Sequence, residues 1–131
     1  GLELMAQTAL GGGLLGGELT LQDPRDLSAD KALKRRSRQS LALRYETTVA
    51  GWQTGAALRH TGTRLDTDPV SFADADNPSR STLDLTLARQ LTPQWRVAAR
   101  LDNATGSKRP EVLGYTAAPR ALLVSLQATV R

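Results

Sequence analysis

Four aspartates lie close together in the middle of the sequence: Asp66, Asp68, Asp74 and Asp76. Carboxylate oxygens are the ligands that Ca²⁺ prefers, so a calcium site is the first chemistry to consider for this segment. The spacing does not match the regular oxygen-ligand loop, and aspartates in a polar loop are usually just solvated. We therefore predict no metal and no cofactor.

The other reactive residue types do not form a catalytic arrangement. The sequence has one histidine, His60, no cysteine and no glycine-rich phosphate loop. Covalent catalysis needs a nucleophile beside a base, and no such pairing is evident. We predict that the protein is not an enzyme. His60 lies near the end of an alternating segment, where we expect an exposed polar side chain.

The chain is basic, with a net charge of +4 and a pI of about 10.1. The run Lys34-Arg35-Arg36-Ser37-Arg38 could contact nucleic acid or lie in an amphipathic helix over residues 28–46. However, the arginines are spread along the whole chain without an aromatic stacking platform, and the residues after 40 alternate as in a strand. We predict no nucleic-acid partner and interpret the run as the basic mouth of a strand in water.

Alternation of apolar and polar residues with a period of two dominates the sequence. It is clearest in the final segment, where Leu122, Val124 and Leu126 oppose Ser125 and Gln127. The pattern predicts seven strands, and the last is about ten residues long, the length that crosses a membrane at a tilt. Short turns at 11–13, 48–51 and 92–94 alternate with long loops at about 23–36, 66–80 and 103–119. This asymmetry is typical of an outer-membrane barrel.

The two faces of the predicted strands differ in chemistry. Tyr45, Trp52 and Trp95 share the phase of the leucines and lie near short turns, as in an interfacial aromatic girdle. The opposite phase carries unpaired-looking charges, which would be costly in a soluble core but not beside water. We predict that these residues face a barrel lumen: Arg44, Glu46, Arg59, Asp84, Arg96, Arg100 and Asp102.

Several motifs resemble those of TonB-dependent outer-membrane receptors, and within them the vitamin B12 (cobalamin) transporters. Residues 23–26 (Asp-Pro-Arg-Asp) and 34–39 are similar to the aspartate-rich loop and double-arginine strand entry of the cobalamin branch. Residues 61–66 resemble its next extracellular strand end, and Asp102-Asn103, Gly114-Tyr115 and Pro119-Arg120 resemble the signature before the last strand. The chain departs from the family pattern in residues 103–106, at Pro119 and at Arg131, where an aromatic residue is usual.

The resemblance implies an all-β fold over residues 1–131, an antiparallel up-and-down meander of about seven strands. This meander would be the C-terminal segment of a roughly 22-stranded transmembrane β-barrel, without its plug domain. The implied setting is the bacterial outer membrane, with lipid as one partner and TonB as another through an N-terminal part that this sequence lacks. The implied function is active uptake of cobalamin or a related corrinoid. An iron-siderophore or haem receptor of the same superfamily is an alternative.

Two other classes stay open: a soluble all-β ligand-binding module, and a pore or autotransporter-type barrel without a plug. For ligand contact we predict the long-loop tips at Asp66, Asp68, Phe72 and Tyr115, because Phe72 and Tyr115 are the only aromatics on that side. Seven strands taken alone from a barrel would leave two raw sheet edges and an apolar face. We therefore expect the isolated chain to associate through its edges.

Overall fold

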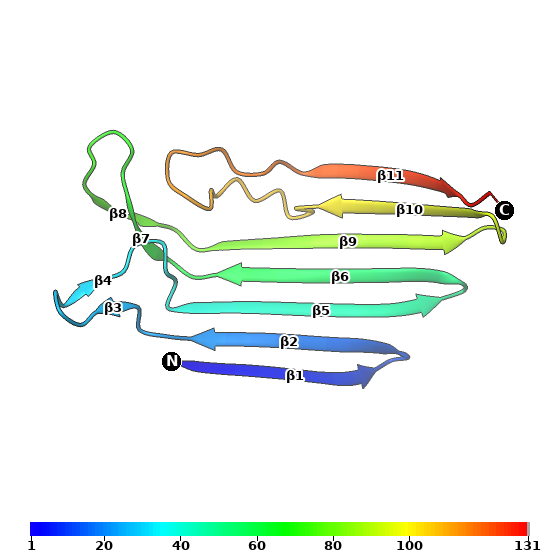
Figure 1. The fold of residues 1–131 in the computed structure, drawn as a ribbon, viewed down its shortest axis with the longest axis horizontal. Coiled ribbons are helices and arrows are strands. Elements are labelled where there is room, and N and C mark those ends of the chain that lie inside the picture. Colours follow the sequence, from blue (N-terminus) through cyan, green and yellow to red (C-terminus); the bar gives the residue numbers. More distant parts are fainter. Residues whose placement is uncertain (131) are drawn as a thin grey trace.

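The structure is a computed structural model that describes residues 1–130. Seven long strands form one antiparallel sheet in the order β1-β2-β5-β6-β9-β10-β11, so each pairs with the next long strand along the chain (Figure 1). Their bounds are β1 Leu2–Leu10, β2 Gly13–Leu21, β5 Gln39–Val49, β6 Trp52–Thr61, β9 Arg80–Gln90, β10 Trp95–Asp102 and β11 Ala121–Ala128. The predicted all-β meander of seven strands is confirmed. No helix in residues 1–130 has the length and apolar character needed to cross a membrane.

The three short turns lie at one end of the strands and the long connections at the opposite end (Figure 1). Gly11 and Gly12 have φ angles of 57° and 79°, and Ala50 and Gly51 have φ angles of 50° and 79°. Positive φ at both central residues is the geometry of the two-residue turn that suits the twist of a hairpin. The second turn is therefore shorter than the predicted 48–51, and β5 continues to Val49.

Two of the long connections contain small hairpins that the sequence did not predict. β3 (Arg25–Asp26) pairs with β4 (Lys31–Ala32), and β7 (Arg64–Thr67) pairs with β8 (Asp74–Asn77). The prediction that residues 66–80 are all loop is therefore wrong at both ends of that segment. Its Asp, Ser and Pro content is typical of loops, but the polar side chains of β7 and β8 find partners within the protein, as described below.

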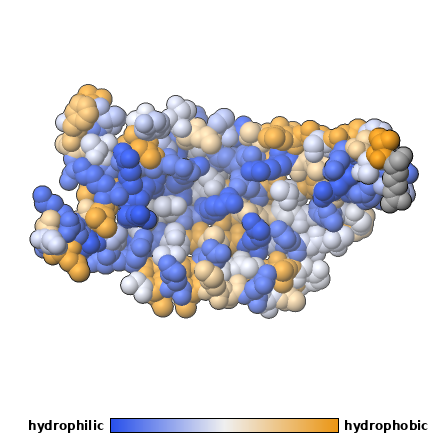
Figure 2. Space-filling model, in the orientation of Figure 1, coloured by the Kyte–Doolittle hydropathy of each residue, from blue (hydrophilic) through white to orange (hydrophobic). Residues whose placement is uncertain are grey.

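The strand register separates apolar from polar side chains over most of the sheet. Directly opposite residues in an antiparallel pair project from the same face. Leu43 pairs with Leu58 and Leu58 with Leu83, which places three leucines of adjacent strands on one face. Arg59 pairs with Thr82 on the other face, where hydrophilic residues cross the middle of the sheet (Figure 2). The predicted phase of both faces is confirmed.

The sheet has very little apolar core. Ala88 is the one hydrophobic residue classed as buried within residues 1–130, whereas Leu122, Val124 and Leu126 on the apolar face are more than 60% exposed. Apart from Gly62, the other buried residues are polar: Arg64, Asp66, Asn77, Thr82 and Asn103. The best-packed part of the molecule therefore lies at the end that carries the long connections.

Candidate functional site at the loop end of the polar face

The predicted lumen-facing charges all lie on the polar face, but most of them are paired. Arg59 Nη1 lies 2.6 Å from Asp84 Oδ2, and Arg100 Nε lies 2.5 Å from Asp102 Oδ1. Arg44 and Glu46 form a longer contact of 3.8 Å, and Arg96 donates a hydrogen bond of 3.0 Å to Gln53 Oε1. The expectation of unpaired charges is therefore corrected. Arg59 and Arg96 find partners on other strands of the sheet, whereas Arg44 and Arg100 find theirs two residues further along the same strand.

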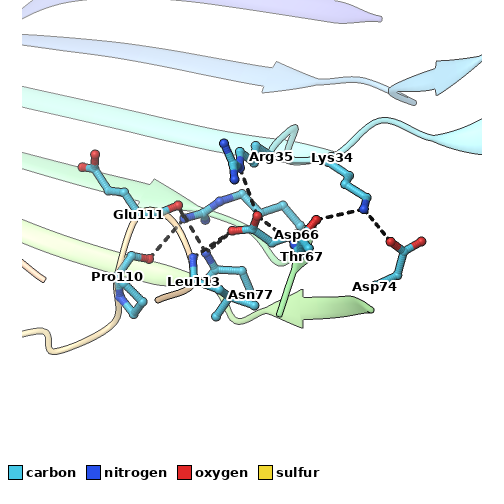
Figure 3. Close-up of polar contacts among 10 residues, drawn as sticks. Lys34, Arg35, Asp66, Thr67, Asp74, Asn77, Pro110, Glu111 and Leu113 are labelled. Carbon is cyan, nitrogen blue, oxygen red and sulfur yellow. Dashed lines mark hydrogen bonds and ion pairs between the residues drawn. The ribbon is translucent and has the colours of Figure 1, made fainter. Parts of the chain in front are cut away.

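At the loop end, Asp66 is the centre of a polar cluster made of Arg35, Arg64, Asp66, Asn77, Glu111 and Leu113, called here the Asp66 cluster (Figure 3). The Asp66 side chain has no exposed surface. One carboxylate oxygen accepts hydrogen bonds from Arg35 Nε at 3.0 Å and from the Thr67 backbone N–H at 2.9 Å. The other accepts the Leu113 backbone N–H at 2.9 Å and Asn77 Nδ2 at 3.4 Å. Asp66 thereby joins all three long connections.

These contacts decide the protonation state of Asp66. Burial alone would raise the pKa of its carboxyl group. The Leu113 and Thr67 backbone N–H groups and the Arg35 guanidinium outweigh burial and hold the pKa of Asp66 well below its usual range. Asp66 is therefore a carboxylate at any physiological pH. Its negative charge is paired with the Arg35 guanidinium within the protein.

Further contacts hold the same three connections together. Asn77 Nδ2 donates to the Glu111 carbonyl at 3.2 Å, and Arg64 Nη2 donates to the Pro110 carbonyl at 3.2 Å and to the Glu111 carbonyl. Arg80 Nη1 lies 2.7 Å from the Glu111 carboxylate. On the other side, Lys34 Nζ lies 2.6 Å from Asp74 Oδ1 and donates to Thr67 Oγ1 at 2.8 Å (Figure 3).

Asn103 organises the start of the last long connection. It lies in the left-handed region, with φ 49°, which Asn tolerates better than most residues. Its backbone N–H donates to Asp84 Oδ1 at 2.9 Å, and its Nδ2 donates to the Ser107 and Ala118 carbonyls, both at 3.0 Å. Asn103 therefore fixes both ends of residues 103–118 and ties them to the polar face.

A cleft of about 590 Å³ lies where the polar face meets these connections. Five arginines line it together with three acidic residues: Arg35, Arg59, Arg64, Arg80, Arg100, Asp84, Asp102 and Glu111. Most of these groups are engaged with one another, so the cleft is held open by ion pairs. The arrangement suits hydrogen bonding to a polar or anionic ligand, because guanidinium groups offer several donors in a fixed plane.

The four predicted ligand-contact residues differ in how accessible they are to a ligand. Phe72 and Tyr115 are 79% and 74% exposed. Their loops meet, because a Cβ atom at Gly114 would lie 2.9 Å from the Pro69 ring. Asp68 accepts the backbone N–H groups of Ser71 and Val70, which lower the pKa of Asp68 and fix the tip of the β7–β8 hairpin. Asp66 is closed to a ligand, whereas direct contact by Asp68, Phe72 and Tyr115 stays a prediction.

Sequence reasoning missed several members of this site. Asn77, Glu111 and Leu113 gave no signal in the sequence. Glu111 and Leu113 contact the cluster through backbone groups, which every residue has. Asn103 was noted as part of a motif before the last strand but had no structural role attached to it. Residues 1–130 contain no group of three or more His, Asp or Glu side chains arranged to hold a metal ion. The site is built to position loops and to present a polar cleft.

The fold has a counterpart among solved structures. A chain of the FpvAI–pyocin S2 complex, a TonB-dependent receptor, superimposes with a TM-score of 0.78 at 17% sequence identity. The match covers 96% of this chain and 19% of the receptor chain, so residues 1–131 correspond to about a fifth of its length. No family model matches the sequence. The seven-stranded sheet thus has the fold of a segment of that receptor chain.

Proposed function

We propose that residues 1–131 form part of the barrel wall of a TonB-dependent outer-membrane receptor that takes up a large nutrient. One observation carries the proposal: the sheet is a single layer with exposed leucines on one face and ion-paired charges on the other. Lipid satisfies the first face and a water-filled lumen satisfies the second. In the full-length protein, a plug and a TonB-contacting segment would precede these strands.

The alternatives fit the same observation less well. A soluble ligand-binding module needs a buried apolar core, and Ala88 is the one hydrophobic residue classed as buried in residues 1–130. A plugless pore would share the two-faced wall. The Asp66 cluster favours the receptor, because it fixes the three long connections to one another beside the cleft rather than leaving them mobile.

Cobalamin or a related corrinoid is the first candidate for the nutrient, on the strength of the sequence motifs. Phe72 and Tyr115 are the side chains we propose for contact with it. The backbone of Phe72 supports this role. A bulky residue with a φ of 58° is uncommon, and Phe72 keeps this conformation although the residue is 79% exposed. Such a conformation points to a function that outweighs its cost.

An iron-siderophore complex is the second candidate, and a different observation favours it. Five arginines line the cleft beneath the loops, against three acidic residues. Guanidinium groups bind carboxylate and other anionic oxygens in bidentate geometry, which suits an anionic ferric complex better than a corrinoid rich in neutral amides.

Uptake by cells that express the full-length protein tests the proposal. We expect radiolabelled cyanocobalamin to accumulate in cells with TonB and not in cells without it. Replacing Phe72 and Tyr115 together with Ala should lower uptake about tenfold, as loss of aromatic contacts does elsewhere. Val70→Ala is the matched control, because Val70 is 85% exposed in the same loop tip. TonB-dependent uptake of a ferric siderophore instead would select the second candidate, and uptake of neither would contradict the transport proposal.

A further inference from the structure

Arg89 interrupts the apolar face of the sheet. Across the paired positions of the seven long strands, this face carries leucines, valines, alanines and other uncharged residues, and Arg89 is its single arginine, lysine or acidic residue. The register fixes this position, because Arg89 pairs with Val97 of β10, whose phase is that of Leu85 and Leu101. A charge at this place needs a physical reason.

The position of Arg89 along its strand gives the first part of the reason. Arg89 is the penultimate residue of β9, next to the turn that leads to β10, so it lies at the short-turn rim of the sheet. An arginine on the lipid-facing side of a barrel costs about 2–4 kcal/mol at the midplane but close to nothing at the interface. In such a barrel, a residue at this rim would lie at the depth of the lipid phosphates.

The surroundings of Arg89 give the second part. Its guanidinium carbon lies 5.4 Å from the centre of the Trp52 ring, and its side chain extends toward Gly51, the last residue of the β5–β6 turn. Trp95, at 44% exposure, follows the turn after β9 and shares the same face. A guanidinium over an indole ring at this distance makes a cation–π contact, which holds the Arg89 head group beside Trp52.

Within residues 1–130, the N–H groups of Arg89 have no hydrogen-bond or ion-pair partner. No ion pair or side-chain hydrogen bond to Arg89 is found within residues 1–130, whereas Arg59, Arg80, Arg96 and Arg100 all have such partners. A guanidinium offers five donors and pairs best with a planar or tetrahedral oxyanion. The structure thus holds an oriented cation beside an apolar surface, with its donors unused.

We infer that Arg89, backed by Trp52, binds the phosphate of a membrane phospholipid whose acyl chains lie along the apolar face of β9 and β10. The inference rests on the proposed function, because the short turns of an outer-membrane barrel lie on the periplasmic side. The leaflet on that side supplies phospholipid, so the ligand is a glycerophospholipid phosphate and not the phosphates of lipopolysaccharide at the opposite rim.

Lipid retention by the full-length protein tests this site. The purified protein in detergent is titrated with dioleoyl-phosphatidylglycerol or with dioleoylglycerol, which lacks the phosphate, and bound lipid is counted by native mass spectrometry. Arg89→Gln should weaken phosphatidylglycerol retention about fivefold, the usual effect of one arginine near lipid phosphate, and should leave dioleoylglycerol retention unchanged. Arg89→Lys should keep part of the effect. Arg96→Gln is the matched control, since Arg96 lies at the same rim on the polar face, and it should retain lipid like the parent protein.

Equal phosphatidylglycerol retention by the parent and Arg89→Gln would overturn the site. So would a loss in Arg89→Gln that appears only with lipopolysaccharide as the added lipid. Heat-modifiability on gels and insertion into lipid nanodiscs are measured first on the same samples. A parent protein that does not insert would overturn the proposed function and the site together, whereas an inserted protein without Arg89-dependent retention would overturn the site alone.

Discussion

The Leu113 backbone N–H donates a hydrogen bond of 2.9 Å to the buried carboxylate of Asp66, across 47 residues of sequence. The same carboxylate accepts Arg35 from the opposite direction. Three long connections therefore converge on one side chain, and the cleft beside them takes its shape from it. The consequences of removing that side chain can be measured.

Asp66→Asn should weaken the contacts among the three long connections without unfolding the sheet. The amide keeps one acceptor oxygen, so the two donors that met the other oxygen lose their acceptor, at a cost of about 1–3 kcal/mol for each donor left buried. Hydrogen exchange followed by mass spectrometry on the full-length protein should show faster exchange in peptides that contain residues 64–77 and 110–115. Asp76→Asn is the control, because Asp76 is exposed in the same hairpin, and it should leave exchange unchanged. Equal exchange in both variants would show that Asp66 is not the hub.

The Asp66 cluster should also resist acid. The folded pKa of Asp66 lies well below the unfolded value of about 3.9, so the unfolded state binds more protons in acid. The stabilisation is therefore complete above about pH 4 and is lost only as the pH falls through the lower folded pKa. Protection of the Leu113 amide, corrected for the intrinsic pH dependence of exchange, should stay constant from pH 7 to about pH 4. A loss of protection between pH 6 and pH 5 would contradict the assignment.

Asn103 should contribute to the stability of the protein in two ways, through its side-chain hydrogen bonds and through its tolerance of the left-handed conformation. Asn103→Ala removes the side-chain hydrogen bonds to Ser107 and Ala118, and with them the polar side chain that lets Asn tolerate the left-handed region, and we expect a loss of about 2–3 kcal/mol. Asn103→Gly relieves the backbone and loses only the hydrogen bonds, so its loss should be smaller. Urea unfolding of the full-length protein in lipid vesicles measures both. If Gly were worse than Ala, the left-handed backbone would not be the second cause.

Ala50 offers a stabilising change. Its φ of 50° is a conformation that costs an ordinary L-residue about 1–2 kcal/mol and glycine almost nothing. Ala50→Gly should therefore stabilise the protein by about 0.5–1 kcal/mol after the entropy cost of glycine is subtracted. Ala57→Gly, in the middle of β6, should destabilise it by a similar amount. The same urea titration compares the two, and destabilisation by both would argue against a positive-φ turn.

The sheet was predictable and most of the site was not, for physical reasons. Alternation with a period of two reports directly which side chains share a face, so the leucines and the charges of β5, β6, β9 and β10 were assigned correctly. The turn ends were placed less well, because the prediction counted Thr48 and Val49 in the turn although both are β-branched residues that favour a strand. The Asp66 cluster depends on contacts between segments that are far apart in sequence, and its partners include the backbone N–H of Leu113 and the carbonyl of Glu111. A composition of Asp, Asn, Ser and Pro signals a loop, and no local pattern shows that Asp66 and Asn77 are buried.

The central claim is that one face of this sheet meets lipid and the other meets water. The chain has no cysteine, so single cysteines placed at adjacent positions of β9 can report on each face. We expect Thr86→Cys, on the polar face, to react with a membrane-impermeant maleimide in the full-length protein in its native membrane. Leu85→Cys, one residue away on the apolar face, should react only with a lipid-soluble reagent. Equal and rapid labelling of both cysteines by the impermeant reagent, in protein that is folded, would contradict the account.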